Sequence, residues 1–171
     1  LVEGVDAALA LDLEQAFSRI SQEFAPHQGL ETPVGFQLSV LGRSCPLSPI
    51  FSKEVYHIGR EALINAFRHS QAANIEVEVE YAAKHLRILV RDDGRGITPE
   101  VLRSGRDGHW GLLGMRERAE SLGARLHVRN RASAGTEVEL LVPGKIAYQT
   151  PPLSRVQNWL SRLYSRKTAR H

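Results

Sequence analysis

Three polar residues recur at every fourth position of one stretch with helical apolar periodicity: Glu61, Asn65 and His69. In a helix this spacing places their side chains on a single stripe. An asparagine carbonyl suits Mg²⁺, which keeps several waters and takes other oxygen ligands from substrate phosphates. Glu61 could accept a proton or orient a metal-bound water, and Arg68 could contact phosphate oxygens. Solvated helix edges carry the same residue types, so the stripe alone leaves both interpretations open.

A second group of polar residues follows a strand-like run, in the segment "VRDDGRGI" at residues 90–97. A carboxylate at Asp92 could accept a hydrogen bond from an exocyclic amine. Gly94 and Gly96 lack side chains and would let a flat ring approach the backbone. No contact is inferred for Asp93, which is expected to be solvated. A turn rich in aspartate and glycine would have the same composition.

Two further segments add glycines and a hydroxyl. In "GHWGLLGM" (108–115), glycines precede or open a helix whose first backbone amides could hold a phosphate. In "AGTEVEL" (134–140), Gly135 and Thr136 enter a strand, and the threonine hydroxyl could meet a nucleotide. Glycines in a loop more often serve flexibility, so each segment alone is weak and the four gain weight together.

The elements that must position these residues follow from periodicity. Helical spacing predicts helices over 5–24, 47–71 and 111–123. Alternation predicts strands over 33–42, 74–83, 85–92, 124–130 and 135–143, with two hairpins. This order favours an α+β fold: a two-layer α/β sandwich with a mixed, mostly antiparallel sheet and helices on one face, over a doubly wound parallel sheet.

The composition of the 171 residues is that of an ordinary globular protein, with 42% hydrophobic and 24% charged residues. The single cysteine excludes an internal disulfide framework and a cysteine-based zinc cage. No run reaches the length of a membrane span and no signal peptide opens the chain. Because the first residue is leucine, we expect a fragment of a longer protein, in which a membrane anchor could lie elsewhere.

The net charge of +3 is unevenly distributed. All 19 acidic residues precede residue 144, so the basic character belongs to the last part of the chain, and nucleic-acid binding by the rest is not indicated. Residues 153–167 place apolar side chains at helical spacing between arginines, which predicts an amphipathic helix. Its apolar face would pack on the core or on a neighbouring copy. Alternatively, the helix would dock on an acidic surface, either anionic lipid or the outward glutamates of residues 76–80.

Taken together, the four segments resemble the Bergerat-type ATP-binding domain of sensor histidine kinases. The asparagine box would be "EALINAFRH" (61–69), the two glycine boxes "DDGRG" (92–96) and "GHWGLLGM" (108–115), and the Gly-Thr box "GTEVEL" (135–140). The wording "GHWGLLGMRERAESLGA" (108–124) is similar to the branch related to nitrate sensors and the DesK-type thermosensor. The resemblance covers roughly residues 50–143.

The resemblance implies ATP and Mg²⁺ as cofactors and assigns roles to single residues. Asn65 would bind Mg²⁺, with Glu61 polarising the site one turn earlier, and these two would be the catalytic residues. Asp92 would bind the adenine amine. The other nucleotide-binding residues would be Arg68, His69, Gly94, Gly96, Ile97, Gly108, Gly111, Leu112 and Thr136, of which Gly108, Gly111 and Leu112 would belong to a lid over the phosphates.

The resemblance also implies an activity and partners. The domain would transfer the γ-phosphate of ATP to a histidine on a dimerisation hairpin of the same or a partner chain, for signalling to a response regulator. In this branch an acidic residue follows that histidine, and none of the seven histidines here has one, so we expect the hairpin to be absent. The full-length protein would be a homodimer, with this domain in the cytoplasm and possible anchoring in the inner membrane.

Two other functions stay open on the same fold. One is an ATPase like those of chaperones, gyrases and mismatch-repair proteins, in which the asparagine-box glutamate activates water. The other is a nonenzymatic ATP-binding module that docks partners. In domain terms, we expect residues 1–46 to form the first helix and strand, 47–143 the core ATP-binding domain, and 144–171 a basic tail.

Overall fold

A computed structural model describes residues 12–24, 33–99 and 110–148, with only the backbone at Trp110. The nine elements, in chain order, are α2 (Leu13–Phe24), β1 (Gly35–Gly42), α3 (Pro49–His69), β2 (Asn74–Ala82), β3 (His85–Asp92), α5 (Trp110–Ser121), β4 (Arg125–Asn130), β5 (Thr136–Pro143) and α6 (Gly144–Ala147). Each strand and long helix predicted within these ranges is present. The short helix α6 was not predicted.

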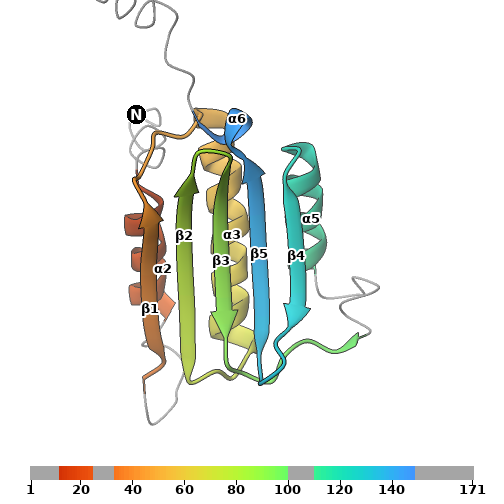
Figure 1. Ribbon diagram of the computed structural model, residues 1–171. Coiled ribbons are helices and arrows are strands. Elements are labelled where there is room, and N and C mark those ends of the chain that lie inside the picture. Colours follow the sequence, from red (N-terminus) through yellow and green to blue (C-terminus); the bar gives the residue numbers. More distant parts are fainter. Residues whose placement is uncertain (1–11, 25–32, 100–109, 149–171) are drawn as a thin grey trace, which may run out of the picture.

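The five strands form one mixed sheet in the order β1-β2-β3-β5-β4. β1 and β2 are parallel, and the other three neighbouring pairs are antiparallel. Figure 1 shows α2, α3 and α5 lying on one face of the sheet, while no described helix covers the other, open face. The predicted fold class, a two-layer sandwich with a mostly antiparallel sheet, is confirmed.

The core lies between the sheet and the helices because both carry matching apolar faces. In β2, the alternating residues from Ile75 to Tyr81 point into the core, and the glutamates between them point to the open face. The central helix α3 is buried along most of its length, with Leu63 and Phe67 almost inaccessible. Ser48 precedes Pro49, whose fixed φ and missing N–H suit the first turn of a helix.

The C-terminal end of α3 is fixed close to the ends of β2 and β3. The Ser70 hydroxyl donates to the Ala66 carbonyl at 2.5 Å and accepts from the Ala72 amide at 3.0 Å. Gln71 then takes the left-handed conformation, with φ of 55°, and the chain turns into β2. The last turn of α3 therefore lies beside the strand ends that carry Asp92.

The packed structure extends past the boundary predicted at Pro143. The Gly144 amide donates to the Lys84 carbonyl at 2.8 Å, and Ala147 is fully buried. The Tyr148 hydroxyl lies 2.9 Å from the carbonyl oxygens of Ala82 and His85. Residues 144–148 thus pack against the β2–β3 turn. Sequence periodicity could not reveal this packing, because α6 is only four residues long.

The amphipathic helix predicted at 153–167 and the first residues of the helix predicted at 5–24 lie outside the described residues. Among the described helices, none combines the length and hydropathy needed to cross a bilayer.

Candidate functional site

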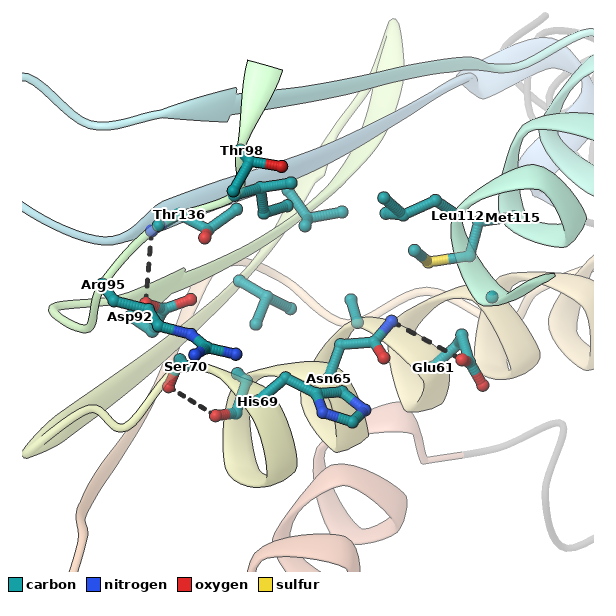
Figure 2. A pocket seen from close by; sticks show the side chains of 17 residues that line it. Glu61, Asn65, His69, Ser70, Asp92, Arg95, Thr98, Leu112, Met115 and Thr136 are labelled. Carbon is teal, nitrogen blue, oxygen red and sulfur yellow. Dashed lines mark hydrogen bonds between the residues drawn. The ribbon is translucent and has the colours of Figure 1, made fainter. Parts of the chain in front are cut away.

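A pocket of about 500 Å³ opens between α3, the ends of β3 and β5, and the start of α5. Figure 2 shows side chains from these elements converging on it. Residues from all the described motifs contribute to its wall: Glu61, Ala62, Asn65, Ala66, His69, Ser70, Val90, Asp92, Arg95, Gly96, Ile97, Thr98, Gly111, Leu112, Met115, Thr136 and Val138.

One wall is the predicted stripe on α3. Glu61, Asn65 and His69 all face the pocket, as their spacing of four residues predicts. The Asn65 Nδ2 lies 3.5 Å from Glu61 Oε1, at the outer limit for a hydrogen bond. With its amide nitrogen toward Glu61, the Asn65 carbonyl oxygen is available for another partner.

The start of α5 approaches this wall closely. A Cβ added at Gly111 would lie 2.2 Å from the Glu61 carboxylate and 3.4 Å from Asn65 Nδ2. The absence of a side chain at Gly111 therefore lets the first turn of α5 lie directly over Glu61 and Asn65. A glycine is therefore needed at position 111 for packing, in addition to its place in the second glycine box.

The opposite end of the pocket carries Asp92, a carboxylate that is only 5% exposed. Its Oδ1 accepts hydrogen bonds from the Gly94 amide at 2.9 Å and the Thr136 amide at 3.2 Å. Burial raises the pKa of Asp92, and these hydrogen bonds offset the rise only in part. The carboxylate is thus held in a fixed orientation in an environment that disfavours its charge, so a ligand that donates a hydrogen bond would be favoured there.

Gly135 makes the contact between β5 and Asp92 possible. It adopts φ of +87°, and a Cβ there would lie 1.9 Å from the Asp92 carbonyl oxygen. Only glycine combines this conformation with this approach. The Gly-Thr pair therefore supports Asp92 from the neighbouring strand, which the sequence alone did not indicate.

The two glycines after Asp92 serve different purposes. A Cβ at Gly94 would lie 2.1 Å from the Ser70 carbonyl oxygen, so Gly94 lets the loop pack on the end of α3. Gly94 is not among the residues that line the pocket, and its expected contact with a flat ring stays a prediction. Gly96 does line the pocket and has φ of +77°.

The sequence suggested that Asp93 is solvated and without contacts, but in the structure it is hydrogen-bonded. Its Oδ1 accepts from the amides of Ala73 and Asn74 at 2.8 and 2.9 Å, and its Oδ2 accepts from the Asn74 side chain at 2.8 Å. The hydrogen bonds from Asn74 and Ala73 lower the pKa of Asp93. The adjacent aspartates therefore divide their roles, since Asp92 faces the pocket and Asp93 ties the start of β2 to the end of β3.

The structure brings most of the predicted site residues together and separates a few. The residues that line the pocket as expected are Glu61, Asn65, His69, Asp92, Gly96, Ile97, Gly111, Leu112 and Thr136. Arg68 is not among the lining residues, and its guanidinium lies 5.1 Å from the centroid of the Phe24 ring. Gly108 lies outside the described residues.

Several lining residues were missed by sequence reasoning. Val90 and Val138 are paired across β3 and β5 and form the floor, which strand alternation could have suggested. Met115 follows Gly111 by four residues, so helical spacing could have indicated it as well. Arg95 had no such signal, because the direction of a loop side chain does not follow from spacing.

The pocket is thus polar at its two ends and apolar between them. Asp92 and Thr136 lie at one end, and Glu61 and Asn65 lie at the other (Figure 2). Aliphatic side chains line the space between: Val90, Leu112, Met115 and Val138. Such a pocket fits an elongated ligand with a flat amine-bearing ring at one end and an oxygen-rich, metal-binding group at the other.

Comparison with known proteins agrees with this geometry. The model of the family described as "Histidine kinase-, DNA gyrase B-, and HSP90-like ATPase" matches residues 52–146. The nitrate/nitrite sensor protein NarX of Escherichia coli K12 is 34% identical over 129 residues, which are 74% of this chain and 20% of that protein. The sensor protein NarQ homolog of Haemophilus influenzae is 35% identical over 133 residues, or 77% of this chain and 22% of that protein.

A solved structure is also similar. It is the histidine kinase domain of the blue-light activated histidine kinase EL346 from Erythrobacter litoralis, with a TM-score of 0.58 and 26% identity. The match covers 78% of this chain and 65% of that one. The chain spans about a fifth of the length of the two curated relatives given above.

Proposed function

The chain belongs to the family of histidine kinase-, DNA gyrase B- and HSP90-like ATPases, as the catalytic ATPase domain of a sensor histidine kinase, and we propose that it transfers the γ-phosphate of Mg·ATP to a protein histidine. The acceptor would lie on a dimerisation hairpin, from which a response regulator takes the phosphoryl group. One observation carries the proposal: the Glu61–Asn65 stripe lies across a single pocket from the buried Asp92.

Adenine fits the Asp92 end. The oriented carboxylate can accept a hydrogen bond from the exocyclic amine, which guanine lacks at the equivalent ring position. Thr136 lies beside it, and the floor formed by Val90 and Val138 offers an apolar surface to the ring. Because an unpaired buried carboxylate is costly, a base that cannot donate at this position would be rejected.

Mg²⁺ and the phosphates fit the Glu61–Asn65 end. The Asn65 carbonyl and the Glu61 carboxylate are hard oxygen donors of the kind that Mg²⁺ prefers. Within the described residues, no group of three or more His, Cys, Asp or Glu could cage a metal, so the remaining ligands would come from phosphates and water. Bound Mg²⁺ would neutralise charge on the phosphates. Asn65 would hold the ion, and Glu61 would orient water bound to it.

A water-directed ATPase is the second candidate. It is favoured by Glu61, whose carboxylate lies at the same end of the pocket as Asn65 and could accept a proton from an attacking water. The two functions differ in the acceptor, since a kinase yields a phosphohistidine and an ATPase yields inorganic phosphate. Both require the same adenine and metal ends.

Calorimetric titration with Mg·ATP and Mg·GTP tests the base assignment. We expect ATP to bind and GTP to bind at least about tenfold more weakly, since one unpaired polar contact is at stake. Asp92→Asn replaces an acceptor by a donor and should weaken ATP binding by about 1–3 kcal/mol. Equal affinities of the parent protein for ATP and GTP would contradict the adenine assignment.

The stability of the unliganded variants provides the control. Because the pKa of Asp92 is raised in the folded protein, its charge destabilises the fold once pH rises above that pKa. Asp92→Asn should therefore leave the thermal midpoint at pH 7 unchanged or higher. Asp93→Asn should lower that midpoint without changing the ATP-to-GTP ratio, because Asp93 holds β2 and β3 together.

Radiolabelled ATP, supplied with the histidine-bearing hairpin of the full-length protein, separates the two functions. Acid-labile, alkali-stable label on the hairpin is the expected product. Release of phosphate at the same rate with and without the hairpin, and with no label on it, would favour the ATPase.

A further inference from the structure

One arginine of the pocket is not accounted for by the roles described above. Among the described lining residues, Arg95 alone is a lysine or arginine, while Glu61 and Asp92 are both acidic. A ligand with a polyphosphate chain would add more negative charge to this wall. The sequence pointed to Arg68 as the phosphate contact, but the Arg68 guanidinium lies over the Phe24 ring. The described wall therefore offers one permanent positive charge, at Arg95.

The backbone of Arg95 is fixed on both sides. Its amide donates to the Ser70 carbonyl at 2.8 Å, an approach that Gly94 allows by having no side chain. Two residues further on, the Asn130 side chain accepts from the Ile97 amide and donates to the Ile97 carbonyl, both at 2.8 Å. These contacts tie the loop to α3 on one side and to β4 on the other, so the position of the Arg95 Cα is set before any ligand binds.

The Arg95 side chain, in contrast, has no ion pair or side-chain hydrogen bond to a described residue. Two arginines beside Asp92 differ from it: Arg91, which precedes Asp92 in the chain, is bound to Glu137, and Arg131 donates to the Asp92 carbonyl at 3.0 Å. Figure 2 shows the Arg95 side chain extending from the Asp92 end of the pocket toward the α3 side chains His69 and Asn65. A charged donor on a fixed backbone, without a protein partner, is preorganised for an anionic ligand.

We propose that Arg95 is a phosphate-contacting residue, whose guanidinium donates hydrogen bonds to phosphate oxygens of the bound nucleotide between the Asp92 end and the Asn65 end. This inference rests on the proposed function, because it assumes an adenine nucleotide with its base at Asp92. It assigns to Arg95 a recognition of charge that is independent of the base. Affinity should then depend on Arg95 for ATP and ADP, less for AMP, and not for adenosine.

The experiment compares Arg95→Gln and Arg95→Lys with the parent chain by calorimetry, using ATP, ADP, AMP and adenosine at constant Mg²⁺. Arg95→Gln should weaken ATP and ADP about tenfold, the size expected of a charge-assisted hydrogen bond. Arg95→Lys should recover part of this loss, because lysine keeps the charge but not the planar fork. The loss should shrink at high salt, where the charge is screened.

Arg125→Gln is the matched control. Arg125 is exposed on β4, its neighbours Leu126 and Val128 face the core, and no described partner binds its side chain. This variant should bind all four ligands like the parent. Thermal melting without nucleotide should be the same for all variants, since Arg95 is anchored through its backbone.

Each alternative outcome overturns the proposal in a recognisable way. An equal loss for adenosine would place the guanidinium on the base rather than on phosphate. Unchanged affinity for ATP in Arg95→Gln would mean that the side chain makes no contact. If the parent chain binds no adenine nucleotide, the proposed function itself fails. If the parent and Arg95→Gln bind ATP equally well, only the role of Arg95 fails.

Discussion

On the open face of the sheet, Arg87 of β3 bonds Glu78 and Glu80 of β2 at 2.5 and 2.7 Å, whereas in the pocket Arg95 has no described partner. Arg87 lies within β3 and Arg95 lies in the loop that follows this strand, yet the first is neutralised by glutamates and the second has no described partner. The difference extends to the acidic residues. Glu137 on the open face is bound by Arg91 and Arg129, while Glu61 in the pocket has, among the described residues, only a long contact with Asn65.

The paired charges of the open face help to form the fold. Leu89 points to this face but is only 1% exposed, although none of the described helices covers it. Its cross-strand partners are Glu78 and Glu139, whose long side chains lie beside it. The stems of charged side chains can shield an apolar residue while their heads pair in water. The expected acidic surface at residues 76–80 is therefore largely neutralised by Arg87.

The pocket is organised in the opposite way. Asp92 and Glu61 lie at opposite ends, and Arg95 makes no ion pair with either within the described residues, so these charges do not neutralise one another. Polar groups that the protein leaves without partners in a concave site are available to a ligand. Charge pairing within the protein therefore distinguishes the open face of the sheet, where Glu and Arg side chains neutralise one another, from the pocket, where they do not.

The largest effect is expected from removing the oxygen donor of the pocket. Asn65→Ala should lower the rate of phosphoryl transfer about 10²-fold or more, since the ion and the phosphates lose their positioning group. Adenosine binding should stay close to that of the parent, because the base lies at the Asp92 end. Calorimetry with and without Mg²⁺, together with transfer to the histidine hairpin, measures both quantities.

Asn65→Asp is the matched variant, since it keeps an oxygen at the same position and should retain Mg²⁺-dependent binding. Transfer by Asn65→Ala at the parent rate would show that this end of the pocket does not hold the metal.

An intermediate effect is expected on the open face, on stability rather than on binding. Glu137→Gln should lower the free energy of unfolding at pH 7 by about 1–3 kcal/mol, because Arg91 and Arg129 lose a poorly exposed charged partner. ATP affinity should not change. Urea denaturation at several pH values provides the measurement.

The pH dependence sharpens this expectation. Burial acts to raise the pKa of Glu137, but the hydrogen bonds from Arg91 and Arg129 outweigh it, and the pKa is lowered from 4.5. Its contribution to stability is therefore present above pH 4.5 and is lost as pH falls through the lowered pKa. The free energy of unfolding of Glu137→Gln should therefore not show this loss as pH falls. Glu76→Gln, which removes an exposed glutamate of the same face, should retain it.

The smallest effect is expected for Arg68. Its guanidinium lies over the Phe24 ring and links α3 to α2, so Arg68→Gln should cost about 0.5–1 kcal/mol of stability. The loss of ATP affinity should be smaller than for Arg95→Gln, and parallel titrations of the two variants compare them directly. A larger loss for Arg68→Gln would restore the assignment made from the sequence.

The sequence by itself determined the strands, the long helices and the residues at the two ends of the pocket. Alternation in β2 and the spacing of Glu61, Asn65 and His69 are local patterns, and local patterns follow from the geometry of a single strand or helix. The position of Asp92 at the end of a strand also followed from the alternation of residues 85–92. These features needed no knowledge of which segments become neighbours.

Tertiary structure alone decided how distant segments use the remaining residues. Gly94 meets Ser70, Asp93 meets Asn74, and Arg68 lies over Phe24, each through contacts between segments that are separate in the chain. The same holds for α6, which is too short for periodicity to reveal and is placed by its contact with the β2–β3 turn. The direction of a side chain such as Arg95 depends on which backbone groups anchor its loop, and those groups come together only when the chain folds.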